Sequence, residues 1–163
     1  MLRTPISPRL TPTAAERAFR QLIRTYGLME RVMQPHFARF GISGAQWGVL
    51  RNLHRAEQEG QTGLRLTDLS RRMLIRPPSV TGIADRLEKV GLIVRRASET
   101  DGRSKQVALT EKGRQLVEQL LTVHPTQIGR VMGGLSVEEQ EQLDRLLERM
   151  SDHIAVLAEG AGD

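Results

Sequence analysis

The stretch LTDLSRRMLIRPPSVTGIADRLEKVGLIVRRASETDGRSKQVALT, residues 66–110, decides the fold class of this 163-residue chain. It begins with a short apolar-faced helix that Thr67 can cap. Pro77 can open a second helix, because proline is tolerated in a first turn, and Gly91 ends it. Two β-prone runs follow on either side of Asp101-Gly102, a dipeptide typical of hairpin turns. Two short helices followed by a hairpin predict a winged helix-turn-helix.

Further helices are expected on both sides of this stretch. Capping boxes beginning at Thr13, Ser43 and Ser136 mark helix starts, and apolar residues recur after each at helical spacing. Pro35 should kink or interrupt one helix near its end, and Pro125 should kink another, which Gly133-Gly134 ends. The predicted order is α-α-α-α-ββ-α-α, a mainly α chain with a small β-hairpin wing.

The apolar residues of the motif helices fix which faces are expected to be buried. The first short helix is expected to carry Leu69, Met73 and Leu74, and the second to point Val80, Ile83, Leu87 and Val90 inward. The expected strands are residues 92–96 and 106–109.

Composition excludes several classes of protein. The chain has no cysteine, which excludes disulfides, thiolate metal sites and cysteine nucleophiles. Aromatic residues make up 3%, too few for a stacking platform that would hold single strands. No apolar run approaches the roughly 20 residues that span a bilayer, and the first residues do not resemble a signal peptide. We therefore expect a soluble, cytoplasmic protein without a membrane anchor or a cofactor.

Charge is unevenly distributed along the chain. Residues 65–114 carry twelve Lys and Arg against six acidic residues, whereas residues 115–163 carry three against nine. A basic middle beside an acidic end favours a polyanion partner for the middle alone. The alternative is that codon bias produces the arginine excess, since Arg outnumbers Lys 21 to 3.

The second helix of the motif has a polar face suited to reading bases. Ser79, Thr81, Gly82 and Arg86 lie away from its apolar stripe. Serine and threonine hydroxyls can donate to or accept from base edges and phosphates, and arginine pairs bidentately with guanine. The alternatives are that Ser79 only caps the helix and that Thr81 lies on an ordinary solvated face.

The hairpin is basic. It carries Arg95, Arg96, Arg103 and Lys105, and Arg103 at its tip could enter a minor groove, where negative potential is focused. Alone, such a hairpin could be a solvated loop. In combination with the polar helix that precedes it, it predicts binding to duplex DNA.

Four segments resemble the MarR family of bacterial winged-helix regulators. They are GISGAQWGVL at 41–50, LTDLS at 66–70, VTGIADRLEKVGLI at 80–93, and DGRSK at 101–105, which continues into LTEKG at 109–113. The resemblance extends from about Thr13 to Ala158. Arg76 and Pro77-Pro78 depart from the commoner sequence before the recognition helix, which puts its first-turn base contacts in doubt.

The resemblance implies a homodimer that binds a pseudo-palindromic operator in duplex DNA. It also implies that Arg103 reaches the minor groove, that Asp101 helps to order the wing, and that Ser79, Thr81 and Arg86 lie on the recognition helix. The expected DNA-binding residues are Arg76, Ser79, Thr81, Gly82, Arg86, Arg95, Arg96, Asp101, Arg103 and Lys105.

The flanking helices support a dimer independently of the resemblance. Their apolar faces have no obvious place to be buried against a DNA-binding part of this size, and a second copy would remove them from water. The alternative is a monomer with an intramolecular helical layer. The expected divisions are a flexible arm (1–12), a single domain (13–158) with a DNA-binding part (41–110) and dimerisation helices (13–40 and 111–158), and a flexible tail (159–163).

Enzyme chemistry and metal binding have no support in the sequence. It contains no Gly-rich phosphate loop, no G-x-S-x-G and no H-E-x-x-H, and its four histidines are scattered. Small-molecule sensing is a hypothesis, because relatives of the family bind aromatic acids or phenols between the dimer helices and the winged helix. The residues expected to serve such a ligand are Tyr26, His36, Arg39, Trp47 and Arg51. Each has an alternative role in the structure. Tyr26 and Trp47 could be core residues, and His36 and Arg39 could be solvated or paired with acidic residues.

The predicted function is therefore a sequence-specific transcriptional regulator, acting as a repressor. Two rivals remain open at this stage, a sequence-indifferent architectural DNA binder and a ligand-binding or interaction module without specific DNA binding.

Overall fold

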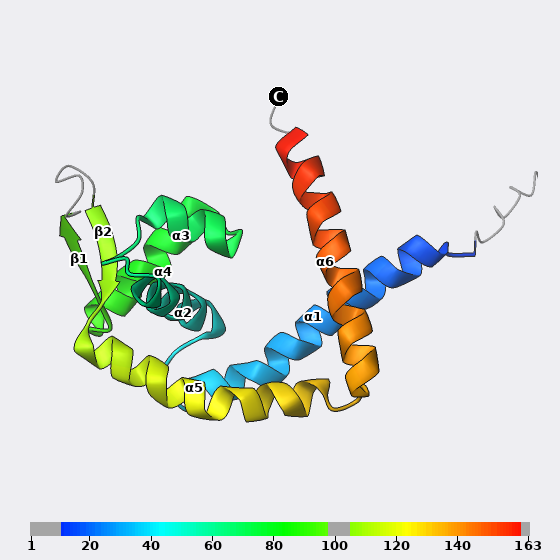
Figure 1. Ribbon diagram of the computed structural model, residues 1–163, viewed down its shortest axis with the longest axis horizontal. Coiled ribbons are helices and arrows are strands. Elements are labelled where there is room, and N and C mark those ends of the chain that lie inside the picture. Colours follow the sequence, from blue (N-terminus) through cyan, green and yellow to red (C-terminus); the bar gives the residue numbers. More distant parts are fainter. Residues whose placement is uncertain (1–10, 98–104, 161–163) are drawn as a thin grey trace, which may run out of the picture. The chain divides into compact units, whose positions relative to one another are not determined.

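The computed structural model describes residues 11–97 and 105–160 (Figure 1). The elements are α1 (Ala14–Ala38), α2 (Gly44–Gln58), α3 (Leu66–Met73), α4 (Pro77–Lys89), β1 (Ile93–Ala97), β2 (Lys105–Leu109), α5 (Glu111–Met132) and α6 (Val137–Gly160). The strands pair antiparallel, with Arg95 opposite Val107. The predicted order and fold class are confirmed. Most of the expected arm (1–12) and the last residues of the expected tail (159–163) lie outside the described residues.

The chain divides into two compact units, residues 1–115 and residues 116–163, with the boundary inside α5. In the first unit, α4 packs against α2, α3 and β1. The side chains of Leu50, Leu69, Val80 and Leu87 are fully buried there. This core joins the two helices of the motif to the hairpin and so fixes the outward face of α4.

Local capping signals start several helices as predicted. The Thr13 hydroxyl accepts from the Glu16 amide at 3.2 Å, and Ser43 accepts from the Gln46 amide at 3.2 Å. Both capping boxes are complete. In the second unit, the Ser136 amide donates to the Glu139 carboxylate at 2.8 Å.

The predicted cap of α3 is wrong. Its N-cap is Arg65, which makes no side-chain capping bond, and Thr67 lies inside the first turn. The cause is tertiary: Leu64 pairs with Val107 through two backbone hydrogen bonds of 2.9 and 2.8 Å. Because that bridge holds Leu64 extended, the helix begins immediately after Arg65.

The two internal prolines do not end their helices. α1 runs through Pro35 to Ala38, and α5 runs through Pro125 to Met132. The carbonyl of Pro35 still accepts from the Arg39 amide at 3.3 Å. Proline therefore removes one donor from each helix without stopping it.

The turn between α3 and α4 is held by Ser70, which is buried. Its hydroxyl donates to the carbonyl of Ile75 at 2.5 Å, and the Ile75 amide donates back to the Ser70 carbonyl at 3.2 Å. This geometry puts Leu74 in the left-handed region, with φ 53°, and leaves its side chain 92% exposed. Leu74 therefore lies just after α3, as its C-cap, and not within the helix. Val90, the C-cap of α4, is also exposed rather than inward.

Residues Thr110 to Gly113 bind the backbone at the C-terminal end of α4, and we call this group of contacts the clasp. The Thr110 hydroxyl donates to the carbonyl of Gly91 at 2.7 Å, and Lys112 Nζ donates to the carbonyl of Val90 at 2.8 Å. The Gly113 amide donates to the Thr110 hydroxyl at 3.1 Å, so Thr110 also caps α5 as predicted. The clasp fixes where α4 ends relative to the start of α5.

Replacing Gly113 with Ala should destabilise the fold toward the upper end of about 1–3 kcal/mol, the usual range for overpacking. A Cβ at this position would lie 2.1 Å from the carbonyl oxygen of Leu92, so backbone must move. Urea denaturation at fixed protein concentration measures the effect. Gly82→Ala is the matched control, because its Cβ would meet only Arg86 Nη1 at 3.8 Å and the change should add up to about 1 kcal/mol. If Gly113→Ala and Gly82→Ala lowered the free energy of unfolding equally, the close approach of Gly113 to Leu92 would not matter for stability.

Long helical faces remain uncovered in each unit. On α1, the exposed fractions are 65% for Phe19, 58% for Ile23 and 56% for Tyr26. On α6, Ile154 and Leu157 are more than half exposed. No helix in the described part of the chain is long and apolar enough to cross a membrane.

Candidate DNA-binding surface

The recognition helix α4 has one buried and one exposed face. Val80, Ile83, Ala84 and Leu87 are buried against the rest of the first unit. On the other side, Arg76, Ser79, Thr81 and Arg86 are exposed, and Gly82 is half-buried. The division follows the predicted stripe, since helix positions three and four residues apart share a face. Burial of the apolar face therefore keeps the polar, cationic face of α4 turned toward solvent.

Within this face, the side chain of Arg86 lies next to Gly82. The Arg86 guanidinium lies back over Gly82, one turn toward the helix N-terminus, because a Cβ there would stand 3.8 Å from Arg86 Nη1. The Thr81 hydroxyl donates to the carbonyl of Pro77 at 3.0 Å, which leaves its lone pairs to accept. Arg86 can therefore donate to a guanine edge and Thr81 can accept from a base or sugar group.

The first turn of α4 lacks the backbone donors that a helix normally offers to an anion. Pro77 and Pro78 have no N–H, and the amides of Ser79 and Val80 both bond to the Arg76 carbonyl, at 3.0 and 3.3 Å. Ser79 is therefore not the cap; Arg76 is the N-cap residue. A phosphate near this turn would be met by side chains, the exposed Arg76 guanidinium and the Ser79 hydroxyl.

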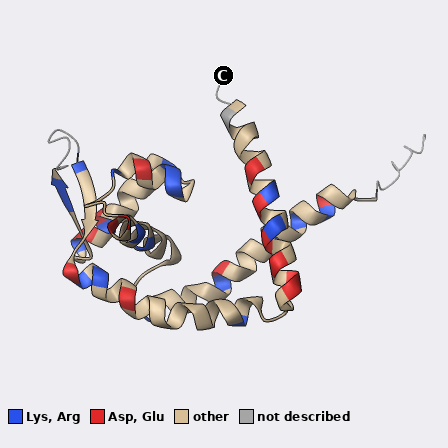
Figure 2. Cartoon of the chain, in the orientation of Figure 1, with Lys and Arg blue, Asp and Glu red and all other residues tan. Residues whose placement is uncertain are grey.

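Among the described residues between positions 65 and 114, the basic side chains fall into two groups; Figure 2 shows where Lys and Arg lie along the chain. One group is already paired: Arg71 with Asp68, Arg72 with Glu59, and Arg114 with Glu57 and Glu111. Arg95, Arg96 and Lys112 also bond within the fold and belong to this group. The other group makes no hydrogen bond or ion pair within residues 11–97 and 105–160. It consists of Arg65, Arg76, Arg86, Lys89 and Lys105. These exposed cations are the ones free to meet phosphates.

Two of the hairpin cations that were predicted to bind DNA already have partners within the chain. Arg95 forms ion pairs with Asp85 and Glu88 of α4, and these partners raise its pKa, the Asp85 hydrogen bond most. Arg96 donates from Nη2 to the carbonyl of Thr62. Lys105, at the start of β2, is exposed, whereas Asp101 and Arg103 lie outside the described residues.

Two of these exposed cations, Arg65 and Lys89, are not among the residues predicted to bind DNA. Arg65 is the N-cap of α3 and has no partner in the described part of the chain. Arg65 stands directly before Leu66, the first residue of the helix. The prediction that Thr67 is the cap placed the helix start too late, so Arg65 was not counted with the motif. Arg65 joins Arg76 and Arg86 as a cation at the ends of the two motif helices.

Comparisons with known proteins identify the family of the chain. Residues 40–104 match the MarR family. The chain is 30% identical over 130 residues to the HTH-type transcriptional regulator MhqR of Bacillus subtilis, covering 79% of this chain and 86% of that protein.

The chain belongs to the MarR family.

Solved structures of other regulators have the same fold as this MarR-family chain. The MepR–DNA complex of S. aureus has a TM-score of 0.71 and 26% identity, covering 88% of this chain and 99% of that one. BpsR of Bordetella bronchiseptica, whose DNA binding is regulated by 6-hydroxynicotinic acid, has a TM-score of 0.75 and 27% identity, covering 87% and 98%. This MarR-family protein is a transcriptional regulator with a DNA-binding winged helix, and it is not an enzyme.

The residues expected to bind a ligand form two separate groups in this MarR-family chain. His36 and Trp47 are buried and both contact Phe37, at ring-centroid distances of 5.3 and 6.2 Å. Tyr26 is exposed on α1 and donates to Glu30 at 3.0 Å. Ten residues of helix separate Tyr26 from His36, a rise of about 15 Å. One small ligand therefore cannot touch both within one chain.

The two arginines of the expected ligand set differ in position. Arg39 is exposed and close enough to His36 for its charge to lower the pKa of that histidine. Arg51 is half-buried on α2, with Nη1 3.5 Å from His54 Nδ1. Within the described residues no three His, Asp or Glu side chains gather as metal ligands would.

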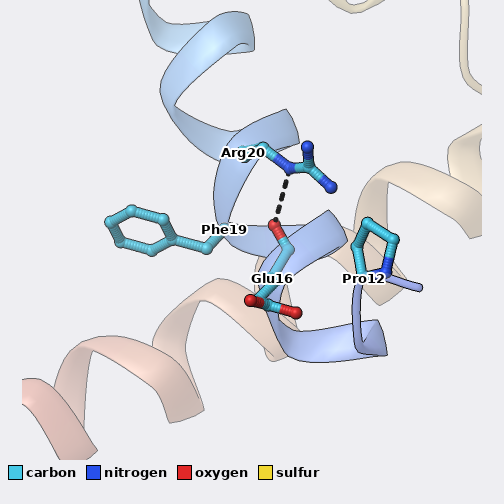
Figure 3. Close-up of a pocket in the computed structure, with 4 residues that line it drawn as sticks. All are labelled: Pro12, Glu16, Phe19 and Arg20. Carbon is cyan, nitrogen blue, oxygen red and sulfur yellow. Dashed lines mark hydrogen bonds between the residues drawn. The ribbon is translucent and has the colours of Figure 1, made fainter. Parts of the chain in front are cut away.

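A shallow hollow lies elsewhere, at the start of α1. It is lined by Pro12, Glu16, Phe19 and Arg20 (Figure 3). Arg20 Nε donates to the Glu16 backbone carbonyl at 3.4 Å, and the Phe19 ring points away from that pair. None of the residues expected to bind a ligand lines it. The hollow is part of the uncovered surface of α1.

Lowering the pH should destabilise the protein through His36. Burial lowers the pKa of His36, and the nearby charge of Arg39 adds to the effect. The folded chain therefore binds this proton less readily than the unfolded chain, so stability is lost as pH falls below the unfolded value of about 6.5. Urea titrations between pH 7 and pH 5 should show a smaller loss for His36→Gln than for the wild type. Identical losses would contradict the prediction.

Proposed function

We propose that this regulator is a homodimeric repressor that binds a pseudo-palindromic operator in duplex DNA and is released by a small aromatic acid or phenol. The observation that carries DNA reading is the outer face of α4, where Thr81 and Arg86 are exposed on a helix whose other side is buried. The DNA complex of the similar protein MepR supports this use of the fold. Arg76 and Lys105 would hold phosphates on either side of the reading helix. Repression would follow from occupying a promoter in the cytoplasm.

The dimer is supported by the uncovered apolar faces of α1 and α6. Phe19, Ile23 and Tyr26 repeat at spacings of four and three residues, so they form one stripe on α1. Burying such a stripe against a second copy gains roughly 25 cal/mol per Å² of apolar area. A two-fold axis would also match an inverted repeat in DNA. We assign residues 13–40 and 111–158 to dimerisation and residues 41–110 to DNA binding.

The ligand part of the proposal rests on the junction of α1 and α2. There, His36 and Trp47 flank Phe37, and Arg39 supplies an exposed cation. Aromatic walls beside a cation suit an aromatic carboxylate. The regulation of BpsR by 6-hydroxynicotinic acid is a precedent of that chemical class. A ligand would act by favouring a dimer whose recognition helices are wrongly spaced for the operator.

Selection from a random duplex library, followed by competition with bulk DNA, tests the proposal. A repressor of this kind should enrich an inverted repeat and prefer it over bulk DNA by roughly 10³-fold or more. Binding without enrichment would instead indicate an architectural protein. Titration calorimetry against a panel of aromatic acids tests the ligand, and no heat with any of them would count against release by such a compound.

A further inference from the structure

Arg95 of β1 is tied to the recognition helix by three contacts. Its Nη2 lies 2.6 Å from Asp85 Oδ1, its Nη1 donates to Glu88 Oε2, and its backbone amide donates to Glu88 Oε1 at 3.1 Å. The Arg95 side chain is 24% exposed, compared with 60% for Asp85 and 38% for Glu88. The guanidinium is thus the shielded centre of the group.

The contacts join the two elements that would meet DNA. Asp85 and Glu88 are three residues apart on α4, the helix that exposes Thr81 and Arg86. Arg95 pairs across the hairpin with Val107, which is buried. A change in the Arg95 pairs would therefore alter the angle between the hairpin and the reading face of α4.

The same pairing removes unfavourable charge from the reading helix. Asp85 directly precedes Arg86, and an unneutralised carboxylate there would repel phosphates. The single charge of Arg95 offsets one of the two negative charges of Asp85 and Glu88, while Arg76, Arg86 and Lys89 stay exposed.

We propose that Arg95 is a positioning residue for sequence reading and not a phosphate contact: its bonds to Asp85 and Glu88 hold the hairpin at the angle that lets α4 and the wing enter DNA together. This inference rests on the proposed function. Non-specific binding depends on exposed cations, whereas sequence reading depends on geometry. Loosening Arg95 therefore lowers the preference for the operator more than it lowers binding to bulk DNA.

The test compares Arg95→Met, Arg95→Lys and Glu88→Gln with the wild type and with Lys105→Met. Dissociation constants for the selected operator and for a random duplex are measured by fluorescence anisotropy at several salt concentrations, with thermal unfolding recorded for each variant. Lys105→Met is the control for an exposed cation, and its loss from both copies should reduce the salt slope by about 1.8.

Arg95→Met is expected to lower the operator-to-random affinity ratio by about tenfold and to leave the salt slope unchanged. Arg95→Lys, which keeps the charge but cannot bridge two carboxylates, should lose part of the ratio. Glu88→Gln should also lower the ratio, although it removes a negative charge from the DNA-facing helix.

Three results would overturn the inference. A salt slope reduced by Arg95→Met as much as by Lys105→Met would make Arg95 a phosphate contact. Equal losses on operator and random DNA with an unchanged slope would leave Arg95 only a stabilising role. Tighter operator binding by Glu88→Gln would show that the acid merely repels DNA. A wild type without any sequence preference would overturn the proposed function itself, and that outcome is visible before any substitution is made.

Discussion

Ile23→Asp is expected to convert the protein into a monomer and to weaken operator binding by at least about 100-fold. Ile23 is 58% exposed on α1, between Phe19 and Tyr26 on one apolar stripe. In a two-fold interface each copy would bury the new carboxylate, and burying an unpaired charge costs several kcal/mol. A monomer would hold one half-site and lose the gain from linking two binding events.

Light scattering and anisotropy on the same samples measure both effects of Ile23→Asp. Gln21→Asp is the matched control, because two residues turn a helix by about 200° and so place Gln21 on the opposite side of α1 from Ile23. That variant should remain a dimer with normal operator binding. An Ile23→Asp protein that stays dimeric would show that this stripe is not the interface.

Arg86→Ala is expected to weaken operator binding by about 30-fold or more and to relax the preference at one base position in each half-site. Arg86 is exposed on α4 and has no partner in the described part of the chain, so its guanidinium is free to pair with a base. A bidentate arginine–guanine pair is worth about 1–3 kcal/mol of discrimination, and a dimer loses two. A loss of about 2 kcal/mol already corresponds to roughly 30-fold in Kd.

Operators altered one base pair at a time resolve the Arg86 contact. Lys89→Ala is the control, since it removes the same charge from the last turn of α4 and should weaken all sequences alike. If Arg86→Ala also weakened every sequence equally, Arg86 would be a phosphate contact and the reading residues would have to lie elsewhere on α4.

Local signals made the element order predictable from the sequence. Thr13 with Glu16 and Ser43 with Gln46 form complete capping boxes because each needs only residues three positions apart. The start of α3 was missed because the Leu64–Val107 bridge sets it, and that contact spans 43 residues of chain. Tertiary contacts therefore decided what local propensity could not.

In the candidate site, too, features set by local patterns could be predicted and features set by tertiary contacts could not. The exposed face of α4 follows from helical periodicity, so the outward positions of Thr81 and Arg86 could be predicted. The roles of the hairpin cations could not, because the partners of Arg95 lie seven and ten residues away on another element. Likewise, His36 and Trp47 both contact Phe37, where α1 packs on α2, and that contact joins two separate helices.

The most direct test of the central claim, that this MarR-family protein reads a specific duplex as a dimer, is fluorescence anisotropy with light scattering on the same sample. The DNA is the inverted repeat enriched from a random library, in excess bulk DNA and at several salt concentrations. We expect a dimer that stays bound to its site in the presence of competitor, with an affinity for that site roughly 10³-fold or more above its affinity for bulk DNA. Binding that disappears under competitor, or a monomer that binds as tightly, would contradict it.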